Sequence, residues 1–329
     1  MVRFFLLLLF LSAPAAAQER INAIQPELVA EGPARPGGEV ELAIVMHTRK
    51  GWHGYWQNPG DAGLPMKVEW RLPPGASVGA LRYPVPERLT IAGLMNYVYE
   101  HDYAVLVRLK VPAAASGSLP LSADAQWLAC TEEVCVPEHG SFSLDVPLGN
   151  GAATDEVRFD RWRQLLPRPL AAPAHFALSG DKLRVAIPLP ASIAVGKPYV
   201  FPLDNGPVAY AAPQTFRRSG DTLIAELKRK RGKPASFAGV LALGDGQGLE
   251  FHAVPGFVPS DGAEVGATDA SALWWAVVGA LAGGLLLNLM PCVFPILALK
   301  ASHLARAGGD EDEARRDALA YTAGTVIGT

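Results

Sequence analysis

Cysteine is scarce in this chain, with three among 329 residues. The spacing Cys-x-x-Cys is absent, which excludes the thioredoxin redox motif. Cys130 and Cys135 lie close together, whereas Cys292 lies alone in an uncharged apolar stretch. Thiols are the only redox groups that the sequence offers. A close pair outside the membrane and a lone cysteine within it predict electron transfer across a bilayer.

Charge is low and unevenly placed. The net charge of −3 argues against a nucleic-acid partner. Residues 19–150 contain 10 Lys and Arg against 15 Asp and Glu, whereas residues 151–260 contain 14 against 9. These are either two solvated surfaces of different composition, or surfaces by which the two domains dock or the acidic one steers a basic partner, and these interpretations stay open.

Long uncharged runs are confined to a few segments. Residues 1–17 have the basic start, apolar core and small-residue end of a secretory signal peptide. The apolar run over 271–300 is long enough to predict a transmembrane helix. Basic residues in the following loop, 301–317, predict that it is cytoplasmic. Residues 318–329 then begin a second transmembrane segment that the chain does not complete.

Long helical periodicity is missing from the exported part, where short alternating segments between Gly and Pro predict strands. We therefore expect a mainly β protein with two β-sandwich domains, 19–150 and 151–260, followed by transmembrane α-helices. Thr154 is expected to cap a short helix between the two domains. The predicted strands are 38–48, 66–72, 103–111, 140–147, 182–189, 198–203, 222–227, 238–243 and 249–254.

Lys and Arg are absent around the cysteine pair, between Lys110 and Arg158, whereas carboxylates are present at Asp124, Glu132, Glu133, Glu138 and Asp145. Carboxylates disfavour a nearby thiolate, and a dithiol with unstabilised thiolates gives up electrons readily. This composition favours a disulfide reductase. A structural staple stays open, although a bridge that closes so short a loop stabilises a fold by only roughly 2 kcal/mol.

Four motifs make the chain similar to a known family. The chain resembles the amino-terminal part of the thiol:disulfide interchange protein DsbD and its ScsB-like relatives. The resemblance runs from about residue 20 to residue 300 and includes the start of the membrane domain. Its motifs are GWHGYWQNPGDAGLP at 51–65, NYVYE at 96–100, WLACTEEVCVPE at 127–138 and PCVFP at 291–295.

The resemblance implies an immunoglobulin-like redox domain in the periplasm of a bacterial inner-membrane protein, with residues 19–270 exported. Cys130 and Cys135 would be the periplasmic pair, and Cys292 the first membrane cysteine. Tyr97 or Tyr99 would belong to an aromatic loop that shields the sulfurs, or would simply pack. The implied function is a protein-disulfide reductase, in processes that include cytochrome c biogenesis and copper tolerance.

The implied partners are a carboxyl-terminal thioredoxin-like domain, cytoplasmic thioredoxin acting through the membrane domain, and a periplasmic disulfide isomerase or thioredoxin-like client. Membrane lipid is a further partner, and no cofactor is expected. The prolines on both sides of Cys292 favour a relay role for it over that of a small buried side chain.

Two alternative functions remain from the sequence. One is a copper-binding module, because Cu(I) prefers soft ligands. The other is a structural scaffold with a stapling disulfide. The candidate copper ligands are the thiols together with Met46, His47, His53, Met66, Met95 and His101.

Overall fold

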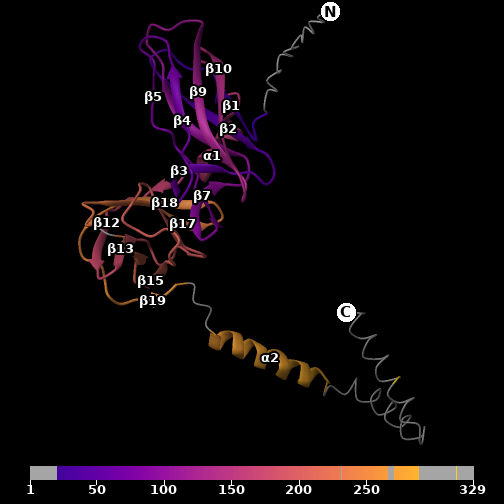
Figure 1. Cartoon of the computed structure of the whole chain (residues 1–329), viewed down its shortest axis with the longest axis vertical. Helices are drawn as coiled ribbons and strands as arrows, with labels where there is room; N and C mark the ends of the chain where they lie inside the picture. The colour runs from indigo at the N-terminus through magenta and orange to yellow at the C-terminus, as the bar shows by residue number, and fades with distance from the viewer. Residues whose placement is uncertain (1–20, 231, 266–269, 289–315, 317–329) are drawn as a thin grey trace, which may run out of the picture. The chain divides into compact units, whose positions relative to one another are not determined.

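The structure is a computed structural model that describes residues 21–230, 232–265, 270–288 and 316. The chain divides into two compact units, residues 1–266 and 267–329. The first unit holds two β parts, and among its described residues it contains a single α-helix (Figure 1). The chain is mainly β, as the alternating segments predict.

The first β part contains ten strands. They are β1 Ile24–Ala30, β2 Glu39–Thr48, β3 Gly54–Gly60, β4 Lys67–Arg71, β5 Ser77–Val78, β6 Glu87–Ile91, β7 Leu94–Tyr99, β8 Tyr103–Lys110, β9 Ser118–Cys130 and β10 Cys135–Pro147. They form a four-stranded sheet β1-β2-β8-β5, a three-stranded sheet β10-β9-β4 and a three-stranded sheet β3-β7-β6.

Strand β9 is the long strand that ends at the first cysteine of the pair. Its residues alternate between buried and more exposed from Leu119 to Trp127, as expected for one face on a core. The sequence does not predict β9, because small residues such as Ala123 and Ala125 supply part of its buried face and weaken the alternation of hydrophobicity. Antiparallel pairing with β10 continues over the full length of both strands.

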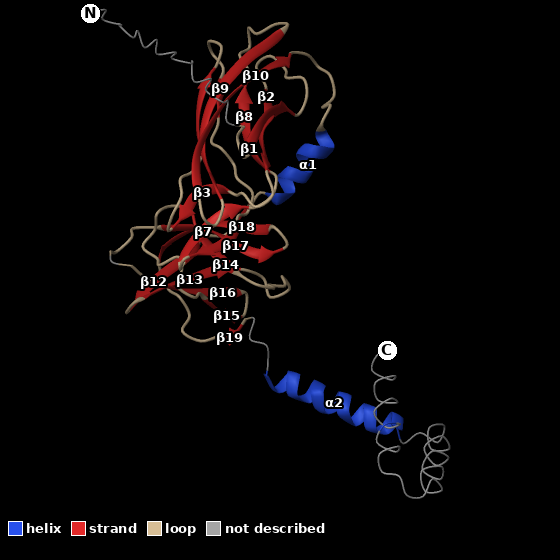
Figure 2. Cartoon of the chain, turned by 45° about the vertical axis from the view of Figure 1, so that its right-hand side comes forward, coloured by secondary structure: helices blue, strands red, loops and turns tan. Residues whose placement is uncertain are grey.

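Strands β3 and β7 pair with each other at the junction of the two β parts (Figures 1 and 2). Strand β3 begins at Gly54. This position favours glycine because a Cβ there would collide with the Tyr103 hydroxyl. Residues 95–99 were expected to form a loop over the cysteines, but they lie in β7. The sequence Tyr97-Val98-Tyr99 alternates aromatic and β-branched residues, and such side chains favour a strand.

The second β part contains β11 Arg168–Pro169, β12 Ala174–Ser179, β13 Lys182–Pro188, β14 Tyr199–Pro202, β15 Thr215–Ser219, β16 Thr222–Lys228, β17 Phe237–Gly244, β18 Gln247–Pro255 and β19 Ala263–Glu264. Eight of these strands follow one hydrogen-bonded path, in which β12 and β18 pair in parallel, and β11 pairs with β18 off this path. One apolar core runs through both β parts.

Helix α1, Glu156–Leu165, connects the two parts and covers the first of them (Figure 2). Phe159 is fully buried against Ala43 and Leu106, which lie on β2 and β8. The cap residue is Asp155, whose side chain pairs with Arg158, and not Thr154 as expected. The helix is thus held by the buried Phe159, by the partly buried Trp162 that packs on the same cluster, and by ion pairs.

The second unit contains α2, Ala270–Asn288. Within the ranges that the structure describes, no helix combines the length and apolar character needed to cross a membrane. The transmembrane helix expected over 271–300 is therefore not found there. Residues 289–300 with Cys292, the signal peptide over 1–17, and the segments 301–317 (except Arg316) and 318–329 lie outside the described residues.

Candidate functional site

Cys130 and Cys135 face each other across a β-hairpin. They are paired in the register of β9 and β10 and joined by a disulfide, with their Cα atoms 4.1 Å apart. The four residues between them form a tight turn. In this turn, the Thr131 hydroxyl accepts hydrogen bonds from the N–H groups of Glu133 and Val134, at 3.2 and 3.1 Å. The local sequence therefore folds back by itself and brings the two sulfurs together.

The two cysteines differ in exposure. Cys130 is fully buried, whereas Cys135 is exposed at the start of β10. The Tyr55 hydroxyl donates a hydrogen bond to the Cys130 sulfur at 3.3 Å. Only one end of the disulfide is therefore open to a partner.

Tyr55 lies over the buried sulfur. It is 4% exposed and packs in a small cluster with Val98 and Cys130. Gly63 passes so close to the Tyr55 ring that a Cβ at this position would overlap it, and the positive φ of 98° also favours glycine. Burial raises the pKa of the Tyr55 hydroxyl, so that it remains a donor at neutral pH.

His53 is the neighbour of Cys130 on the side opposite Cys135. His53 and Cys130 form an antiparallel bridge, in which the backbone N–H of each residue donates to the carbonyl of the other, at 2.8 and 3.0 Å. The His53 ring is 3% exposed and packs edge-on against the Tyr55 ring, with centroids 5.4 Å apart. Its Nε2 atom is buried and has no hydrogen-bond partner.

The described contacts of Tyr97 and Tyr99 lie away from the sulfurs. The Tyr97 hydroxyl hydrogen-bonds the Tyr199 hydroxyl at 3.2 Å, and its ring packs on Phe201. Tyr99 stacks on Tyr103 and donates to a backbone carbonyl at 2.7 Å. Both tyrosines thus have packing contacts, their shielding role stays a prediction, and Tyr55 is the aromatic residue that contacts the sulfur.

The other face of β3 contacts the second β part. Trp56, 1% exposed, packs edge-on against Phe201 with ring centroids 6.0 Å apart. The Asn58 amide donates to the carbonyls of Pro202 and Asp204 at 2.8 and 3.1 Å. Sequence patterns do not show this contact, although the dense aromatic run around Trp56 marks the segment.

The acidic residues around the pair have separate roles. The carboxylate of Glu138 is buried and accepts hydrogen bonds from the Trp127 indole at 3.0 Å and from two backbone N–H groups near residue 23. Asp124 pairs with Arg71 and accepts from Ser141. Glu132 and Glu133 are exposed in the turn between the cysteines. The turn carboxylates are thus the ones placed directly beside the pair in the fold.

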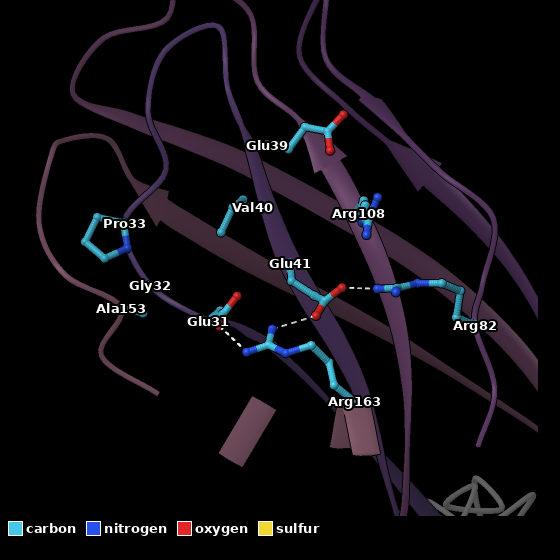
Figure 3. A pocket seen from close by; sticks show the side chains of 10 residues that line it. All are labelled: Glu31, Gly32, Pro33, Glu39, Val40, Glu41, Arg82, Arg108, Ala153 and Arg163. Atoms are coloured by element: carbon cyan, nitrogen blue, oxygen red, sulfur yellow. Dashed lines mark hydrogen bonds and ion pairs between the residues drawn. The ribbon is translucent and has the colours of Figure 1, made fainter. Parts of the chain in front are cut away.

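A polar pocket of about 370 Å³ lies elsewhere on the first β part (Figure 3). Inside it, Glu41 is 8% exposed and pairs with Arg82 and with Arg163 of α1, the latter at 2.8 Å. Arg163 also pairs with Glu31 at 2.7 Å, and this hydrogen bond raises the pKa of the guanidinium. The pairs of Arg163 fasten α1 to β2 and to the residue that follows β1, so these charged side chains have a structural role.

The candidate copper ligands are dispersed. Met46 and Met66 are buried in the large apolar core, and the exposed His47 pairs with Asp102 at 2.8 Å. Within the described ranges, no group of three or more His, Cys, Asp or Glu side chains is arranged to hold a metal ion. No specific observation favours the copper alternative.

Comparison with known proteins gives a family match and a fold match. Residues 25–147 match the family "Thiol:disulfide interchange protein DsbD, N-terminal". The structure of the N-terminal periplasmic domain of ScsB from Proteus mirabilis is 18% identical, has a TM-score of 0.57, and aligns over 72% of this chain and 95% of that one. The reduced N-terminal domain of Neisseria meningitidis DsbD is 18% identical over 39% of this chain and 87% of that one, with a TM-score of 0.27. No curated protein sequence matches the chain.

Proposed function

We propose that the chain is a protein-disulfide reductase whose redox centre is the Cys130–Cys135 pair, and the match of residues 25–147 to the DsbD N-terminal domain family supports this. The observation that carries this proposal is the unequal exposure of the two sulfurs. A stapling disulfide needs no open end, whereas exchange with a partner requires one reachable sulfur.

The exchange proceeds in two steps. In the reduced protein, the exposed Cys135 thiolate attacks the disulfide of a partner, a mixed disulfide forms, and one partner sulfur leaves as a thiolate. Cys130 then attacks the Cys135 sulfur and releases the second partner sulfur. The pair loses two electrons and two protons, and the partner gains them. Because Cys130 is buried beside the bond that must break, it resolves the mixed disulfide without competing for the first attack.

The proposed direction of electron flow rests on charge. Residues 111–157, which include the whole cysteine hairpin, contain no Lys or Arg, and the turn between the cysteines holds Glu132 and Glu133. Neither thiolate is stabilised by a cation of its own hairpin, and this favours giving electrons over taking them. Tyr55 covers the buried sulfur and restricts oxidants to Cys135.

In the cell, we propose that electrons come from cytoplasmic thioredoxin through a membrane domain that includes Cys292. A thioredoxin-like domain beyond residue 329 would then reduce Cys130–Cys135, which would pass electrons to a periplasmic disulfide isomerase or thioredoxin-like client. Residues 19–270 would be periplasmic and the protein would be held in the bacterial inner membrane. The family resemblance and the uncharged run from Ala270 to Leu299 support this arrangement.

Trapping of the mixed disulfide tests the function. The reduced Cys130→Ser protein is mixed with an oxidised thioredoxin-fold protein, and products are separated without reductant. We expect a stable mixed disulfide through Cys135, because the resolving thiol is gone. Reduced Cys135→Ser is the matched control, and we expect at least a tenfold lower yield from it because Cys130 is buried. Equal yields, or no adduct with either variant, would contradict the assignment.

A further inference from the structure

The Cys130 sulfur lies in a row of three cross-strand neighbours. His53 is paired with Cys130 on one side, and Cys135 is paired with it on the other. Paired residues in antiparallel strands point to the same face of a sheet. Tyr55, two positions after His53 in an extended chain, shares that face and reaches the sulfur. The His53 ring therefore lies on the side of the sheet that carries the reacting sulfurs.

The Nε2 atom of His53 lacks a partner while the cysteines are joined. A buried polar atom without a hydrogen bond costs about 1–3 kcal/mol, and native proteins contain few of them. The disulfide offers His53 no donor, but reduction gives Cys130 an S–H group, which is a weak donor. Reduction would therefore offer the unpartnered Nε2 atom a donor on its own face of the sheet.

Cys130 needs a base in the second exchange step. Its sulfur is fully buried, and the hairpin that carries it has no cation to favour a thiolate. The Tyr55 hydroxyl donates a hydrogen bond to this sulfur. Its raised pKa keeps it protonated at neutral pH, so it does not act as a base there. A neutral imidazole is the side chain that accepts a proton under these conditions.

We propose that His53 is the base that accepts the proton of the Cys130 thiol when Cys130 displaces a partner from Cys135. This role rests on the proposed exchange function. As the S–S bond from Cys130 to Cys135 forms, the bond from Cys135 to the partner sulfur breaks, and its electron pair leaves with the partner. The Cys130 proton passes to Nε2 of His53, which later returns it to the solvent or to the departing thiolate.

The ionisation of His53 fits this role. Burial lowers the pKa of the imidazole, and no charged side chain contributes to that shift, so the ring is neutral and able to accept a proton at neutral pH. The titratable groups on its face of the sheet are Tyr55, Cys130 and Cys135. The charged residues of the adjoining turns, all exposed, are Arg49, Lys50, Glu132 and Glu133.

The test uses the full chain with Cys292 replaced by serine, so that Cys130 and Cys135 are the two thiols present. The protein is reduced and rapidly mixed with 5,5′-dithiobis(2-nitrobenzoate) as the disulfide. One thionitrobenzoate is released by attack of Cys135, and a second by attack of Cys130 on the resulting mixed disulfide. We expect His53→Gln to slow the second release about 100-fold at pH 7, the usual contribution of a general base. The first release should stay within twofold of that of the parent, and His47→Gln, at an exposed histidine, should alter neither.

The pH dependence of the second release gives a second test. The second release should fall as pH drops through the lowered pKa of His53 and stay level above it, whereas in His53→Gln it should rise steadily with pH. An unchanged second release in folded His53→Gln, or a parent profile without the low-pH fall, would overturn the role of His53. Failure of the first release would instead overturn the exchange function itself.

Discussion

The two faces of β3 and β7 serve different purposes. On one face, Tyr55 and Val98 pack with Cys130 in a small apolar cluster. On the other face, Trp56 and Tyr97 join an aromatic cluster with residues of the second β part. Successive side chains of a strand alternate between faces, so adjacent residues serve the redox pair and the junction in turn.

This contrast shows how a cysteine-free part can matter to a redox site. The second β part contributes no thiol, but it packs against the layer that covers Cys130. In the cluster, the Tyr97 ring lies 4.9 Å from Phe201 and 5.5 Å from Tyr210, centroid to centroid. These aromatic contacts pack the strand that carries Tyr55 against the second β part. We infer that stability and redox tuning can be separated by substitutions on opposite faces.

The largest effect should come from the junction face. Trp56→Ala removes a buried aromatic and leaves a cavity, and we expect it to lower the free energy of unfolding by about 4 kcal/mol. Urea denaturation followed by fluorescence measures this. Alkylation of Cys135 in the folded variant should stay within twofold of that of the parent. A loss below about 1 kcal/mol would mean that the two β parts do not depend on this contact.

A matched pair of hydroxyl deletions should sharpen the comparison. Tyr97→Phe loses one buried hydrogen bond and should cost about 1 kcal/mol of stability without changing the reduction potential of the pair. Tyr55→Phe removes the donor to Cys130, and a reduced sulfur accepts hydrogen bonds better than a disulfide does. Its potential should therefore become more negative by about 20 mV, the equivalent of about 1 kcal/mol. Equilibration with glutathione measures both, and equal potentials would contradict the division between faces.

The smallest effect should come from a site on neither face. The hydrogen bond with Asp102, aided by Glu27, raises the pKa of His47 above its ordinary value. Because the folded state then binds the proton more tightly, this stabilisation is complete below about pH 6.5 and is lost as pH rises through the raised pKa. His47→Gln should lower stability by a few tenths of a kcal/mol at pH 5 and by less at pH 8. A larger loss at pH 8 would reverse the sign.

Local sequence patterns predicted much of the fold. The alternation of β2 and β8 identified strands whose bounds differ from the structure by only a residue or so. Strand β9 was missed because alanine at its buried positions weakens the hydrophobic alternation. Residues 95–99 were interpreted as a loop because the segment before them is polar. Their assignment to β7 depends on pairing with β3, which lies far away in the sequence.

The sequence by itself determined the composition of the redox site: a cysteine pair on a tight turn, without a cation in its hairpin. Local chemistry suffices there, because residues 130–135 make the turn and the bridge among themselves. The tertiary structure alone decided which sulfur is buried, that Tyr55 covers it and that His53 lies beside it. Those contacts join residues more than 70 positions apart in the sequence. No local pattern encodes such pairing, because it depends on which sheet faces meet once the core has packed.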